Sequence, residues 1–108
     1  MAEILLVLAI VFEVIGTTSM KLSEGFQNLL PSLVIFLCYG ISIGFLTMAV
    51  RTIDISVAYA MWSAIGMVLI SIIGIFWFHE SATAWKVISI GVIILGVVSL
   101  QISTMMET

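Results

Sequence analysis

Glu13 is the residue whose type and position most clearly indicate chemistry in this chain. It lies in the middle of residues 4–20, a run composed mainly of Leu, Ile, Val and Ala. If this run crosses a bilayer, the carboxyl group lies near mid-membrane. An ionised side chain there is costly and usually marks an ion, proton or substrate site. The structural alternative is a neutral carboxyl group that hydrogen-bonds a neighbouring helix.

Polar and aromatic residues in the other apolar runs could complete such a site. At helical spacing, one stripe contains Ser56, Tyr59, Trp62, Ser63 and Gly66. The faces of Tyr and Trp rings attract cations, including quaternary ammonium groups. Gly16 and Thr17 share the stripe of Glu13 and leave space and a hydroxyl group beside the acid. The apolar run between these two stripes, residues 29–50, offers Tyr39 and Ser42, three residues apart.

A carboxylate beside aromatic faces suits the exchange of a proton for an organic cation. A low-dielectric medium disfavours the ionised form of a carboxyl group, and that form needs a counter-charge. A proton and a cation cannot both neutralise Glu13, so competition between them is the simplest form of coupling. We expect a transport protein and not an enzyme, with no cofactor and no metal site. Cys38 is the only cysteine, which excludes an intramolecular disulfide and a Cys-based metal site.

The elements that position these residues are membrane-spanning helices. The chain is 63% hydrophobic and 8% charged, whereas about a quarter of the residues are charged in a soluble domain. A span takes roughly 20 helical residues, and backbone groups in lipid need internal hydrogen bonds. The apolar runs predict spans at residues 4–20, 29–50, 55–78 and 84–103. These spans form one all-α membrane domain over residues 1–108, with both termini on one side. We expect membrane lipids as its surroundings and no nucleic-acid partner. The short segment 52–54 predicts that the second and third helices are antiparallel neighbours.

Two further patterns concern assembly. Arg51 lies on the side of the termini and Lys21 and Lys86 lie on the other, so the positive charges barely select an orientation. Insertion in both orientations is therefore expected. In the last span, small residues recur at three- and four-residue spacing around one valine, a pattern typical of close helix packing in lipid. This seam consists of Ser89, Val92, Gly96 and Ser99. Since one protomer is small, we expect the seam to contact a second subunit.

Motifs along the whole chain resemble the small multidrug resistance family, and within it the quaternary ammonium exporters. They are Glu13-Val14-Ile15-Gly16-Thr17-Thr18, Met20-Lys21, Ser23-Glu24-Gly25-Phe26, Pro31-Ser32, Cys38-Tyr39, Ala58-Tyr59-Ala60, Trp62-Ser63 and Gly66. The resemblance implies an antiparallel, dual-topology homodimer in the inner membrane that exchanges protons for hydrophobic cations. It implies that Glu13 is the shared proton and substrate site, with Trp62 and Tyr59 lining the pocket. It also implies that Thr17, Tyr39, Ser63 and Ser42 lie near the substrate, and that the last helix forms the dimer.

The sequence departs from the family pattern at a few positions, which keeps alternatives open. Ala64 and Ser89 stand where the family usually has glycine. The loop Ile53-Asp54-Ile55-Ser56 is similar to that of members that work as heterodimers, including polyamine exporters. One alternative is therefore a subunit of a heterodimeric exporter of drugs or polyamines. The other is a non-transporting membrane subunit that pairs through its last helix.

Overall fold

The computed structural model describes residues 1–106, and all of its regular structure is helical. The helices are α1 (Ala2–Leu22), α2 (Leu29–Ala49), α3 (Ile55–Phe76) and α4 (Ala84–Met106). Each is long and apolar enough to cross a membrane. The predicted fold class of an all-α membrane protein is confirmed.

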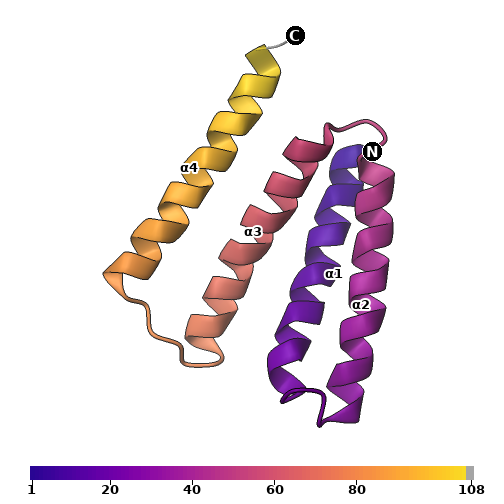
Figure 1. Cartoon of the computed structure of the whole chain (residues 1–108), viewed down its shortest axis with the longest axis vertical. Helices are drawn as coiled ribbons and strands as arrows, with labels where there is room; N and C mark the ends of the chain where they lie inside the picture. The colour runs from indigo at the N-terminus through magenta and orange to yellow at the C-terminus, as the bar shows by residue number, and fades with distance from the viewer. Residues whose placement is uncertain (107–108) are drawn as a thin grey trace.

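α1 is the central helix of the packed part of the protomer. Figure 1 shows α2 along one side of α1 and α3 along the other, with α4 beyond α3. The most extensive packing is between α1 and α2, followed by that between α1 and α3, whereas α4 packs mainly against α3. The prediction that α2 and α3 are direct neighbours is therefore wrong for most of their length. A short loop fixes the distance between two helix ends, and it leaves room for a third helix further along.

The two ends of the bundle carry different loops. The N-terminus, the α2–α3 loop and the end of α4 lie at one end of the bundle, and the α1–α2 and α3–α4 loops lie at the opposite end (Figure 1). Arg51 thus lies at one end, and Lys21 and Lys86 at the other, as the sequence predicted.

Backbone conformation explains where α1 ends. Glu24, Gly25 and Phe26 all have positive φ, at 49°, 71° and 70°, a region that helices do not use. Ser23 stabilises this turn: its buried Oγ donates to Met20 O at 2.8 Å and accepts from Phe26 N at 3.3 Å. A tight reversal follows, and it lays α2 back along α1.

α3 is shorter than the predicted span 55–78, because the chain leaves the helix after Phe76. His79 has a φ of 58°, and Glu80 N donates to Gly74 O at 2.9 Å. The loop thereby folds back onto the last turn of α3. α4 begins where Thr83 Oγ1 accepts a hydrogen bond of 3.2 Å from Lys86 N, a typical N-cap interaction.

The core is small and is built around α1. Leu6, Ile10 and Val14 pack with Ala49 of α2 and Ala58 of α3. α4 has no buried residue, and large apolar side chains such as Val92 and Leu95 are more than half exposed. A soluble monomer rarely exposes this much apolar surface, so these faces contact lipid or another subunit.

Candidate cation and proton site

Glu13 lies where α1 faces both α2 and α3, and its Oε1 is held by two donors. Thr17, one turn further along α1, donates to Oε1 at 2.7 Å, and Tyr39 Oη of α2 donates to it at 3.4 Å. The hydroxyl groups of Thr17 and Tyr39 are also within hydrogen-bonding distance of each other, and because each has one hydrogen, the three contacts share two hydrogens. The structure therefore joins three of the predicted site residues in one polar cluster.

The second carboxylate oxygen, Oε2, is in a different environment. It is buried and has no hydrogen-bond partner among the described residues. It lies against Gly66 of α3, where a Cβ would come within 2.5 Å of it. Buried polar atoms in proteins are nearly always paired, so Oε2 is the atom of this carboxylate that remains available to a proton or a cation.

Gly16 gives Tyr39 its position. A Cβ at Gly16 would lie 2.7 Å and 2.9 Å from two ring carbons of Tyr39. The glycine therefore lets the Tyr39 ring lie directly on α1, and this close packing brings the phenol group to Glu13. The sequence predicted that Gly16 leaves space beside Glu13. In the structure, the aromatic ring of Tyr39 from α2 fills the space over Gly16.

Trp62 of α3 is held in place by Ser42 of α2. Its Nε1 donates to Ser42 Oγ at 3.3 Å, and the fully buried Ser42 donates to Ala9 O of α1 at 2.6 Å. These hydrogen bonds link three helices and fix the orientation of the indole ring.

A cavity of about 280 Å³ opens beside Glu13. Its walls come from α1 and α3 and consist of Glu13, Thr17, Trp62, Ser63, Gly66, Met67 and Ile70. The sequence placed Gly66 on the stripe of Trp62 and Ser63 but did not assign Met67 and Ile70 to the site. Ile70 continues that helical stripe, so the spacing alone could have indicated it. This region is called the Glu13 cavity below.

Tyr59 lies elsewhere. Its ring centroid is 5.5 Å from that of Trp62, but the side chain is 59% exposed and borders a separate hollow with Leu46 and Val50. Within the described protomer, Tyr59 does not line the Glu13 cavity, because about two turns of α3 separate it from the level of Gly66.

The seam on α4 is unpartnered in the protomer. Ser89, Val92, Gly96 and Ser99 are all exposed, whereas the groove between α3 and α4 is lined on the α4 side by residues such as Val97 and Gln101. The seam therefore faces away from α3.

Comparison with known proteins decides the family. Residues 1–93 match the family model described as Small Multidrug Resistance protein. The chain belongs to this family. It is accordingly a multi-pass membrane transport protein and not an enzyme.

Relatives align along most of this small multidrug resistance protein. It is 56% identical over 99 residues to a Bacillus subtilis protein named uncharacterized membrane protein YvaE, covering 92% of this chain and 83% of the relative. It is 43% identical over 97 residues to the quaternary ammonium compound-resistance protein QacE of Escherichia coli, covering 90% and 88%. A guanidinium exporter of Citrobacter freundii is 36% identical over 104 residues, covering 96% and 99%.

Proposed function

We propose that the protein exports hydrophobic and quaternary ammonium cations in exchange for protons, and that both ligands compete for Glu13. The observation that carries the proposal is the asymmetry of the Glu13 carboxylate. Thr17 and Tyr39 anchor Oε1, while Oε2 is buried beside Gly66 without a hydrogen-bond partner. A proton on Oε2, or a cation close to it, neutralises the carboxylate, and each excludes the other.

The cavity walls favour an apolar cation over a metal ion. Apart from the carboxylate, the Glu13 cavity offers the hydroxyl groups of Thr17 and Ser63, the indole ring of Trp62 and apolar side chains. Hard metal ions prefer several oxygen ligands, whereas an aromatic face beside one carboxylate suits an organic cation. The relatives named for resistance to quaternary ammonium compounds support the same class.

The size of the cavity favours a site shared between two protomers. At about 280 Å³, the Glu13 cavity lies just below the range of roughly 300–1,000 Å³ typical of pockets for drug-sized ligands. A second protomer would enlarge it and supply a second Glu13. The exposed α4 seam offers a contact surface for that protomer, and the nearly balanced positive charges at the two ends permit an antiparallel arrangement.

Flux measurements test this function. Purified protein in liposomes should take up or release tetraphenylphosphonium only when a proton gradient is imposed, and Glu13→Gln should abolish that flux. The amide keeps the shape of the side chain but cannot hold the proton or neutralise the cation. Flux that ignores the proton gradient would contradict the proposal. A protein that transports only when another small membrane subunit is added would instead indicate a heterodimer.

A further inference from the structure

A second cavity continues from the Glu13 cavity toward the end of the bundle that carries the α1–α2 and α3–α4 loops. It has a volume of about 360 Å³ and shares Thr17 and Ile70 with the Glu13 cavity. Beyond those two residues its walls include Thr18 and Lys21 of α1, Gly74 of α3, and Glu80 of the α3–α4 loop. This second space is called the outer cavity below. The two cavities are adjacent, and their succession from the Glu13 carboxylate to a second carboxylate at the end of the bundle is called the path below.

Glu80 is held at the outer cavity by contacts that depend on Gly74. Its backbone N–H donates to Gly74 O at 2.9 Å, and its carboxylate lies on the bare Cα of Gly74. A Cβ there would approach Glu80 Cδ to 2.9 Å and its Oε1 more closely still. The absence of a side chain at Gly74 thus lets the carboxylate rest against α3, where the outer cavity opens.

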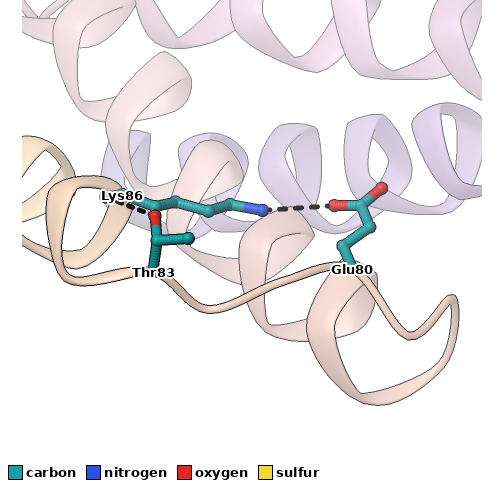
Figure 2. Close-up of polar contacts among 3 residues, drawn as sticks. All are labelled: Glu80, Thr83 and Lys86. Atoms are coloured by element: carbon teal, nitrogen blue, oxygen red, sulfur yellow. Dashed lines mark hydrogen bonds and ion pairs between the residues drawn. The ribbon is translucent and has the colours of Figure 1, made fainter.

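The carboxylate of Glu80 already binds a cation in this structure. Lys86 Nζ lies 3.3 Å from Glu80 Oε1, and Figure 2 shows the ammonium group pointing across the loop toward it. The side chains of Glu80 and Lys86 are 46% and 32% exposed. Exposed pairs of this kind are weak, about 0–1 kcal/mol, so another cation can displace the lysine. Glu80 therefore offers an exchangeable binding position for positive charge.

Thr18 gives the wall of the same cavity a free polar atom. Its Oγ1 is buried and has no hydrogen-bond partner among the described residues. The walls of the outer cavity therefore offer the hydroxyl groups of Thr18 and Thr17 together with apolar side chains such as Ile70. They also include Lys21, a second positive side chain besides Lys86, so Glu80 is the acid that offsets positive charge at this mouth. Such a lining suits a hydrophobic cation with a delocalised charge.

We propose that Glu80 is a second cation-binding carboxylate at the mouth of this path, which attracts substrate cations to Glu13 in competition with Lys86. The inference rests on the proposed function and adds the route by which the substrate reaches the site. Glu80 acts on the rate of association, because a charge at the mouth of a cleft concentrates ligands of opposite sign. Glu13 acts on affinity, because it contacts the bound cation.

The test compares association rates of tetraphenylphosphonium, followed by stopped-flow tryptophan fluorescence on the full chain in liposomes. Glu80→Gln should lower the association rate constant by about three- to tenfold and weaken its dependence on ionic strength. Lys86→Gln should change both quantities in the opposite direction, because it removes the competing cation. A purely structural role of the ion pair would instead shift both variants in the same direction, and that result would overturn the proposal.

Two further variants serve as a steric probe and a control. Gly74→Ala leaves every charge in place but displaces the Glu80 carboxylate, so it should lower the association rate as Glu80→Gln does. Glu24→Gln removes an acid from the other loop at the same end of the bundle, outside the outer cavity, and should leave the rate near that of the parent. Equal rates for Glu80→Gln and Glu24→Gln would overturn the role of Glu80.

Glu13→Gln separates the two proposals. Tight binding by that variant would refute the proposed function itself, whatever Glu80 does.

Discussion

Glu13 of α1 and Gly66 of α3 are in direct contact, and this contact places the unpaired Oε2 on the side of the Glu13 cavity. A Cβ at position 66 would come within 2.5 Å of that oxygen. No other residue type could leave the carboxylate where it is, so the position of the proposed proton and cation site depends on a glycine of a neighbouring helix.

Gly66→Ala should therefore weaken cation binding while the helices stay intact. Overpacking of this kind costs about 1–3 kcal/mol, which corresponds to a loss of tetraphenylphosphonium affinity of about five- to 150-fold if binding bears the cost. Calorimetry at one fixed pH measures it. Gly40→Ala is the matched control, because nothing lies within 4 Å of a Cβ there. If Gly66→Ala bound as tightly as the control, the contact would have no part in binding.

Thr17→Val should lower cation affinity because it removes the 2.7 Å hydrogen bond to Glu13 Oε1. Hydrogen bonds to charged groups contribute about 1.5–3 kcal/mol, so a loss of about tenfold or more is expected. Tyr39→Phe removes the longer bond of 3.4 Å and should have a smaller effect. Thr104→Val is the control, since it removes a hydroxyl group that bonds only Leu100 O of its own helix, outside both cavities. An effect of Thr104→Val equal to that of Thr17→Val would argue against a specific role of Thr17.

Trp62→Leu should weaken binding of aromatic or quaternary cations by about 0.5–2 kcal/mol, the range of cation–π contacts. The leucine keeps an apolar side chain but removes both the π face and the hydrogen bond to Ser42. Trp62→Phe keeps a π face and should recover part of the loss. Trp85→Leu provides the comparison, because Trp85 is 80% exposed at the start of α4. Unchanged affinity in Trp62→Leu would assign Trp62 to helix packing alone.

A single added lysine should fix the orientation of the chain in the membrane. Ser81→Lys adds a positive charge at the end of Lys21 and Lys86, and Thr52→Lys adds one at the end of Arg51. Both positions are exposed. Each variant alone should lose activity if the dimer is antiparallel, and co-expression of the two should restore it. Reporters fused to the C-terminus should show both orientations for the parent chain, and a single orientation would contradict the homodimer.

Composition and spacing were sufficient to predict the four helices and to identify Glu13 as the main candidate site residue. Long apolar runs identify membrane helices because lipid leaves the backbone no other partner, and an acid such as Glu13 is conspicuous in such a run. The Glu13–Thr17 pair follows from helical spacing within α1. Contacts between helices could not be predicted from the sequence. The packing of Tyr39 on Gly16, and of Glu13 on Gly66, depends on how far α2 and α3 are rotated and shifted against α1. The position of α1 between α2 and α3 was missed for the same reason.

The α3–α4 loop shows a second limit of sequence reasoning. The positive φ of His79 and the return of Glu80 onto Gly74 shorten α3 relative to its apolar run. The apolar run continues through Trp77 and Phe78, so the hydropathy of the sequence does not show where the backbone leaves the helix. The contact between Glu80 and Gly74 becomes visible only when the loop is folded.

Competition between protons and a cation at Glu13 is tested most directly by calorimetry of tetraphenylphosphonium binding across pH, in two buffers of different ionisation enthalpy. In the proposed mechanism ionised Glu13 binds the cation and protonated Glu13 does not, so affinity should rise with pH until the carboxylate is fully ionised. Within that range the binding enthalpy should depend on the buffer, because bound protons are released, and Glu13→Gln should show neither effect. An affinity that stays constant from acid to alkaline pH, with the same enthalpy in both buffers, would contradict the mechanism.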